Sequence, residues 1–140
     1  MRSRTIVFAL FSTLVAATFL VCTLSSVQAQ KKVDFSTEIQ PIFQKSCASC
    51  HGLKSQMGQL RLDARSAAMI GGQSGKIIHP GSAKDSILYQ RVAGLGDQAR
   101  MPMGGKLSQD QIEAIRLWVE QGAEWPESAA STESAAIKKH

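Results

Sequence analysis

Two cysteines and a histidine near the middle of the chain form the pattern with the clearest chemistry. Cys47 and Cys50 are separated by two residues, and His51 follows directly. This spacing is typical of the covalent attachment of a c-type haem. The two thiols add to the haem vinyl groups as thioethers, and the adjacent histidine becomes the proximal ligand of the iron. The pattern therefore predicts one covalently bound haem c.

Two other uses of this cysteine pair are less well supported. A thioredoxin-like redox pair would lie at the start of a helix that follows a strand in a βαβ unit. A structural zinc site would need a second pair of ligands. The sequence around Cys47 and Cys50 shows neither pattern, so haem attachment is the preferred interpretation.

The beginning of the chain is typical of a secretory signal. Arg2 and Arg4 precede a long apolar run, and Val27 and Ala29 supply the small side chains expected before a cleavage site. We expect residues 1–29 to be a signal peptide and the protein to be exported to the periplasm, a compartment compatible with c-type haem. The alternative is an uncleaved membrane anchor, because about 20 apolar residues can span a bilayer.

The remaining chain has the size of one small domain. We expect a haem-binding domain over residues 30–125, followed by a disordered tail over residues 126–140 that is rich in Ser, Ala, Glu and Lys. The formal net charge of +5 falls to +3 when the two arginines of the signal segment are removed. The basic residues are scattered rather than clustered, so the sequence predicts no nucleic-acid partner.

The best-specified element is a helix near the end of this domain. Ser108 and Gln111 have the spacing of a capping box, Leu107 is placed to pack onto Ile112, and Gly122 fits the position just after the helix. Apolar residues recur on one face of this helix, namely Ile112, Ile115, Trp118 and Val119.

Two further helices are expected earlier in the chain. Apolar residues at helical spacing between Phe35 and Phe43 predict a helix that is capped by Asp34 or Ser36 and ends near Cys47. Pro41 either kinks this helix or marks its first turn. A shorter helix is expected over residues 82–92, with Ser82 as its N-cap and Ile87, Leu88 and Val92 facing inward. Glycine-rich turns separate these elements.

A second axial ligand must come from far along the chain to reach the opposite face of a haem. Met101 is the preferred candidate because it lies in a loop just before the last helix, where Pro102 restricts the backbone that presents the sulfur. Met103 and His79 are the rivals. A methionine opposite the histidine raises the reduction potential, whereas a second histidine lowers it.

Arginine side chains could also contact the haem propionates, since a guanidinium pairs well with a carboxylate. Arg61, Arg65 and Arg100 are candidates. Arg61 is preferred because the alternation in residues 60–63 points it away from its apolar neighbours.

These residues together resemble the planctomycete-type cytochrome c domain, a branch of the small class I-like c-type cytochromes. The resemblance covers nearly the whole domain and runs through residues 35–42, 47–52, 60–63, 79–81, 86, 100–102, 107–108, 118 and 122–125. It implies an all-α fold with long glycine-rich loops, in which the first and last helices pack beside the haem. It also implies His51 as proximal ligand and the methionine before the proline as distal ligand.

Two positions depart from the family pattern. The family usually has Met-Pro-Pro where this chain has Met101, Pro102 and Met103, which keeps Met103 open as a ligand. His79 stands where the family usually has an aliphatic residue, which keeps bis-histidine ligation open.

We expect a periplasmic monohaem cytochrome that carries single electrons between larger redox proteins and is not itself an enzyme, although it could be a small subunit of an oxidoreductase complex. The alternative is a haem-based sensor or a peroxidatic enzyme whose distal position is open or whose methionine is displaceable. A membrane partner is expected only if the signal segment is not cleaved.

Overall fold

A computed structural model describes residues 31–127, and the signal peptide expected over residues 1–29 lies outside that range. Most of the expected tail, residues 128–140, also lies outside it. The helical elements, in chain order, are η1 (Phe35–Ile39), α2 (Gln40–Ser46), η2 (Met57–Gln59), α3 (Arg65–Ile70), α4 (Ile87–Ala93) and α5 (Gln109–Glu120). Residues 31–127 contain no β-strand, so this region is helical, as an all-α fold requires.

The first expected helix is present, but its start is a π-helical turn. The Asp34 carboxylate accepts hydrogen bonds from the backbone N–H and the hydroxyl of Thr37, each at 2.8 Å, which caps η1 as expected. Pro41 lies in the first turn of α2, where its missing N–H removes no helical hydrogen bond. Helix α2 ends at Ser46, so Cys47 directly follows it.

Helix α5 forms with the boundaries and cap that its sequence predicts. The Ser108 hydroxyl accepts a hydrogen bond from Gln111 N at 3.2 Å, and the Gln111 side chain accepts one from Ser108 N at 2.9 Å. Gly122 follows the helix with φ 104°, a backbone conformation that glycine adopts without strain. The apolar face expected for this helix is buried and comprises Ile112, Ile115, Trp118 and Val119.

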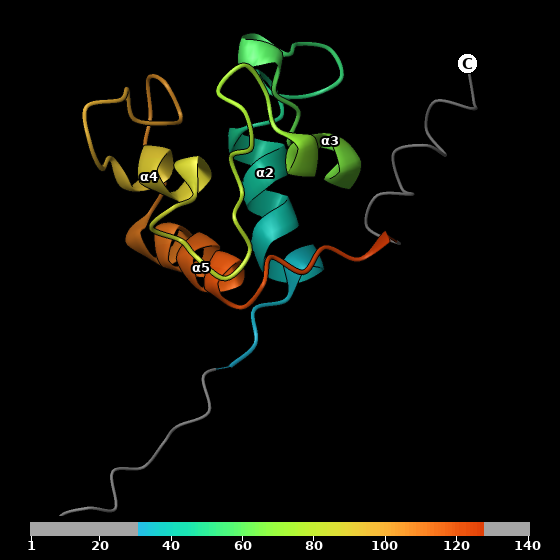
Figure 1. The fold of residues 1–140 in the computed structure, drawn as a ribbon, viewed down its shortest axis with the longest axis vertical. Helices are drawn as coiled ribbons and strands as arrows, with labels where there is room; N and C mark the ends of the chain where they lie inside the picture. Colours follow the sequence, from blue (N-terminus) through green and yellow to red (C-terminus); the bar gives the residue numbers. More distant parts are fainter. Residues whose placement is uncertain (1–30, 128–140) are drawn as a thin grey trace, which may run out of the picture. The chain divides into compact units, whose positions relative to one another are not determined.

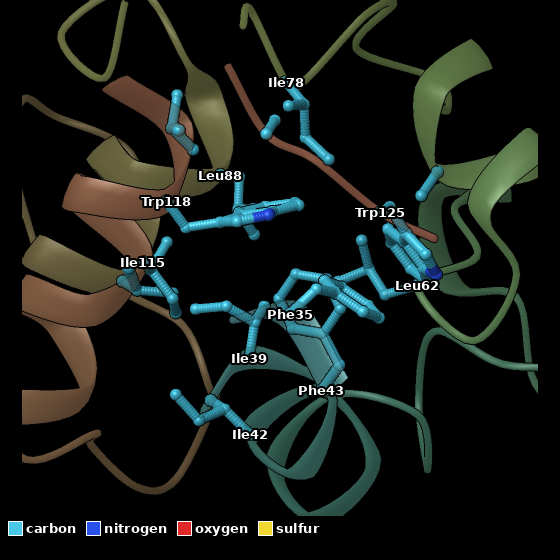
Figure 2. Packing of buried hydrophobic residues seen from close by; sticks show 14 of the residues in the cluster. Phe35, Ile39, Ile42, Phe43, Leu62, Ile78, Leu88, Ile115, Trp118 and Trp125 are labelled. Atoms are coloured by element: carbon cyan, nitrogen blue, oxygen red, sulfur yellow. The ribbon is translucent and has the colours of Figure 1, made fainter. Parts of the chain in front are cut away.

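An aromatic cluster joins the beginning and the end of the described region. Phe35 stacks on Trp125 with ring centroids 4.1 Å apart, and Phe43 meets Trp118 edge to face at 5.8 Å. Figure 2 shows these four rings close together, and Figure 1 shows the segment after α5 passing beside η1. Helix α5 packs against both η1 and α4, so the first and last helical segments are in contact.

The prediction that a helix starts at Ser82 is wrong. Helix α4 begins at Ile87, and the Ser82 hydroxyl donates a hydrogen bond to Asp85 at 2.5 Å instead of capping a helix. The buried Ser86 hydroxyl donates to the carbonyl oxygen of Ser82 and accepts from the N–H of His79, each at 2.8 Å. These contacts hold residues 82–85 in a turn, and the helix starts only after it.

Candidate functional site

A cavity of about 560 Å³ lies next to the paired cysteines. Some residues of each of five segments line it; the segments are residues 46–51, residues 57–62, residues 72–77, helix α4 and residues 101–103. Most of the lining side chains are apolar, and the volume is within the range of small-molecule and cofactor sites. The paired cysteines therefore line a cavity suited to a largely apolar group.

The cysteines line this cavity because the chain coils tightly after α2. Cys47 O accepts hydrogen bonds from Cys50 N at 3.1 Å and from His51 N at 2.8 Å. A Cβ added at Gly52 would collide with the carbonyl oxygen of Ala48, so the turn has no room for a side chain there. As a result, Cys47, Cys50 and His51 all contribute to one wall of the cavity.

The His51 ring is oriented by a backbone carbonyl. Its Nδ1 lies 2.9 Å from the carbonyl oxygen of Met57. A carbonyl oxygen only accepts hydrogen bonds, so Nδ1 carries a proton and the neutral ring leaves Nε2 as its lone-pair donor. A hydrogen bond of this kind to the second ring nitrogen is the usual way in which proteins orient a metal-binding histidine.

The surroundings of Cys47 do not match a redox dithiol. Cys47 follows the C-terminal end of α2, whereas reactive cysteines of that type are commonly activated at a helix N-terminus. Burial raises the pKa of the Cys47 thiol to about 11. The thiol is therefore protonated near neutral pH and is a poor nucleophile for disulfide exchange.

Arg61 lies in the loop that follows His51, but it does not line the cavity. Its guanidinium pairs with Asp63 through hydrogen bonds of 2.8 and 3.0 Å. Asp63 also accepts the N–H of Leu53 at 2.7 Å, and Leu62 N donates to His51 O at 2.7 Å. In this conformation Arg61 and Asp63 fasten the loop that follows the histidine.

Of the other two candidate arginines, Arg65 pairs with Glu127 at 2.9 Å, and Arg100 donates to Val92 O at 3.2 Å. Neither of them lines the cavity. The expectation that one of the three candidates contacts a haem propionate therefore stays a prediction.

Replacing Asp63 with asparagine should weaken this loop in a pH-dependent way. Burial raises the pKa of Asp63, but the hydrogen bond and charge of Arg61 and the Leu53 N–H outweigh it and hold the pKa below its ordinary value. The carboxylate therefore stabilises the fold above about pH 4, and this contribution disappears as the pH falls through the folded-state pKa. We expect Asp63→Asn to lower the free energy of unfolding by about 1–3 kcal/mol near pH 7, with a smaller difference near pH 3.

Urea unfolding of the full chain, followed by circular dichroism at both pH values, measures this effect. Asp97→Asn, in an exposed loop, is the matched control and should change little. A deficit of Asp63→Asn that is the same at both pH values would show that the carboxylate charge is not what stabilises the loop.

The three candidates for a second axial ligand lie in different surroundings. Met101 is half-buried and lines the cavity. Met103 also lines it, but 72% of the residue is exposed. His79 is exposed and is not among the lining residues. The structure thus brings Met101 and Met103 into the same cavity as His51 and leaves His79 outside it.

The residue that sequence reasoning missed is Arg91 in α4. It is half-buried and supplies the only arginine or lysine side chain among the residues that line the cavity. One sequence signal was available, because Arg91 follows Ile87 by four residues and Leu88 by three, which places it on the same helical face.

Residues 31–127 lack two kinds of feature. No helix there is long and apolar enough to cross a membrane. The same residues contain no group of three or more histidine, cysteine, aspartate or glutamate side chains arranged to hold a metal ion.

Comparison with known proteins identifies one family. The model of the family described as Planctomycete cytochrome C matches residues 47–103. The matched region begins at Cys47 and ends at Met103, so it includes the attachment motif and both methionines of the loop before α5. No curated protein and no solved structure matches the chain. The resemblance inferred from the sequence is confirmed for this region.

Proposed function

Since the model of the family described as Planctomycete cytochrome C matches residues 47–103, we propose that this protein is an exported monohaem cytochrome that carries single electrons between larger redox proteins. The observation that carries the proposal is the shared cavity. Cys47, Cys50 and His51 line one part of it, and Met101 reaches it from a loop fifty residues further along the chain.

The side chains around the cavity fit a covalently attached haem. Two thiols are available for thioethers, and His51 presents Nε2 because Nδ1 is held by the Met57 carbonyl at 2.9 Å. Met101 offers a thioether sulfur as the distal ligand, with Met103 as the rival. His79 is the weaker rival, because it is exposed and not among the lining residues.

The bound haem would supply a one-electron couple between ferric and ferrous iron, and the protein would tune that couple. The Met57 carbonyl fixes the orientation of the His51 ring. Apolar side chains such as Leu60, Ile77 and Leu88 line the cavity and would shield a bound haem from water. Ligation by histidine and methionine together favours a higher potential than ligation by two histidines.

Two exposed methionines support a role in transfer to other proteins. Met57 and Met103 both line the cavity, and 59% and 72% of these residues are exposed. They therefore lie where the cavity meets solvent, and they offer an apolar rim for brief docking of a redox partner. The partners themselves are redox proteins rather than nucleic acids.

The location of the protein is also part of the proposal. The segment 1–29 has the features of a signal peptide, and a c-type haem requires export from the cytoplasm. If that segment is not cleaved, the same domain would act at the membrane surface.

The second candidate function is a haem-based sensor or a peroxidatic enzyme. It requires a distal position that is open or easily vacated. The position of Met101 at the cavity favours the carrier, because a methionine bound at the distal side would keep small molecules from the iron.

Binding of carbon monoxide to the reduced full-length protein, together with its turnover of peroxide, separates these functions. For the carrier we expect the reduced spectrum to stay unchanged under carbon monoxide at neutral pH, and peroxide to be consumed far more slowly than by the denatured protein, in which the iron is exposed. Rapid formation of a carbon monoxide complex, or catalytic loss of peroxide, would show that the distal position is open and would favour the sensor or the enzyme.

A further inference from the structure

The loop that carries Met101 is fastened to the end of helix α4 by hydrogen bonds. Met101 N donates to Arg91 O at 3.0 Å, and the Arg91 guanidinium Nη1 donates to Ala99 O at 2.9 Å. Arg100 Nε donates to Val92 O at 3.2 Å. The last carbonyls of a helix have no partner within the helix, and here the methionine loop supplies donors for two of them.

Arg91 holds this loop from two sides. Its carbonyl oxygen accepts from Met101, while its side chain reaches the carbonyl oxygen of Ala99, two residues before the methionine. Residues 99–101 are therefore held between the backbone and the side chain of one residue. The backbone contact survives any substitution at position 91, but the side-chain contact requires a long donor.

The backbone at the end of helix α4 brings the loop that carries Met101 back against the helix. Gly94 ends α4 in the left-handed region with φ 71°, which reverses the chain. A Cβ added at Gly94 would lie 3.1 Å from Cδ of Arg100, so the returning segment packs closely against the helix end. Arg91 and Met101 both line the cavity.

From this arrangement we infer that Arg91 is a positioning residue for the distal ligand: its guanidinium holds residues 99–101 so that the Met101 sulfur stays at the cavity. The inference rests on the proposed function, because it takes Met101 as the ligand. It adds that the strength of distal ligation depends on a side chain ten residues away that does not bind the iron.

Loss of the Arg91 side-chain hydrogen bond would change the competition between Met101 and an added ligand for the iron. A free ligand such as imidazole binds ferric iron only in the fraction of molecules from which the methionine has left. Loss of one hydrogen bond that holds the loop should increase that fraction by roughly 3- to 10-fold. Imidazole should then bind more tightly by the same factor.

The test compares Arg91→Leu and Arg91→Lys with the unaltered holoprotein in an imidazole titration followed by absorption. Leucine removes the donor and keeps the cavity wall apolar, whereas lysine keeps a charged donor. We expect Arg91→Leu to bind imidazole roughly 3- to 10-fold more tightly and Arg91→Lys to stay closer to the unaltered protein. Hydrogen exchange at the Met101 amide should accelerate in Arg91→Leu and much less in Arg91→Lys.

Two further variants separate a failure of the role of Arg91 from a failure of the distal-ligand assignment. Arg116→Leu, on the outer face of α5 where Arg116 pairs with Glu113 and Glu120, controls for general destabilisation. Met101→Ala defines imidazole binding without competition. The role of Arg91 is wrong, and the proposed function stands, if Met101→Ala binds imidazole more tightly but Arg91→Leu does not. The same conclusion follows if Arg116→Leu changes imidazole binding as much as Arg91→Leu does. If Met101→Ala itself has no effect on imidazole binding, Met101 is not the distal ligand; the inference about Arg91 then fails, and the carrier function stands only if Met103→Ala strengthens imidazole binding instead.

Should Arg91→Leu fail to accumulate as a folded holoprotein, Arg91→Gln replaces it. Glutamine keeps a polar side chain that is shorter than arginine, so we expect the same direction of change in imidazole affinity. Unchanged affinity in Arg91→Gln, together with tighter binding in Met101→Ala, would again overturn the inference.

Discussion

A chain in which Cys47 and Cys50 are both serine is expected to carry no covalently bound haem when it is produced in cells that attach haem to exported proteins. Serine hydroxyls do not add to the vinyl groups, so the two linkages are lost together. His51 alone would then hold haem only reversibly. Haem staining of the denatured chain should fall to background.

The single substitutions make this prediction more specific. Cys47→Ser and Cys50→Ser should each leave one thioether and one unreacted vinyl group, and the absorption of the reduced haem should shift to longer wavelength. Ser49→Ala is the matched control, because Ser49 is exposed and lies between the two cysteines. Full haem staining of the double variant would mean that the attachment site lies elsewhere.

The second large effect is expected at the distal position. Met101→Ala should remove the charge-transfer band that marks a bond between methionine sulfur and ferric iron, and the iron should become high-spin or bind a small ligand. Met103→Ala should keep the band, because Met103 is 72% exposed whereas Met101 is half-buried at the cavity. The absorption spectrum of each oxidised holoprotein measures this directly.

Three results would change the assignment of this ligand. Loss of the band in Met103→Ala alone would make Met103 the ligand. Loss of a low-spin spectrum in His79→Ala would favour bis-histidine ligation, although His79 does not line the cavity in this structure. A spectrum that none of the substitutions changes would leave the distal position without a protein ligand and would favour the sensor or the enzyme.

The sequence predicted those parts of the fold that depend on local signals. Helix α5 has its cap, its apolar face and its terminal glycine within one continuous segment, so its boundaries could be inferred from neighbouring residues alone. The same applies to the Asp34 cap and to the end of the first helical segment near Cys47.

The parts that could not be predicted depend on contacts between distant or structurally irregular segments. Ser82 looked like a helix cap, but the Ser86 hydroxyl bonds to Ser82 O and His79 N and delays the helix. Helix α3 starts after Ala64 with no side-chain cap, so no local signal marked it.

The candidate site likewise has a part that local sequence signals predicted and a part that depends on distant contacts. The cysteines and the histidine are adjacent in sequence, so their pattern was readable directly. Arg91 belongs to no recognisable motif, because its proposed role depends on hydrogen bonds with a loop that returns to the end of α4. Arg61 was chosen from strand-like alternation, but the structure pairs it with Asp63 at 2.8 Å, away from the cavity lining.

Peptide mapping of the natural holoprotein tests the central claim most directly. Trypsin cleaves after Lys45 and Lys54, so residues 46–54 form one peptide that contains both cysteines and the histidine. The account predicts that this peptide carries the mass of one haem and absorbs visible light after denaturation and digestion. A colourless peptide 46–54 in which both thiols are free to alkylation, from protein made in haem-attaching cells, would contradict the account.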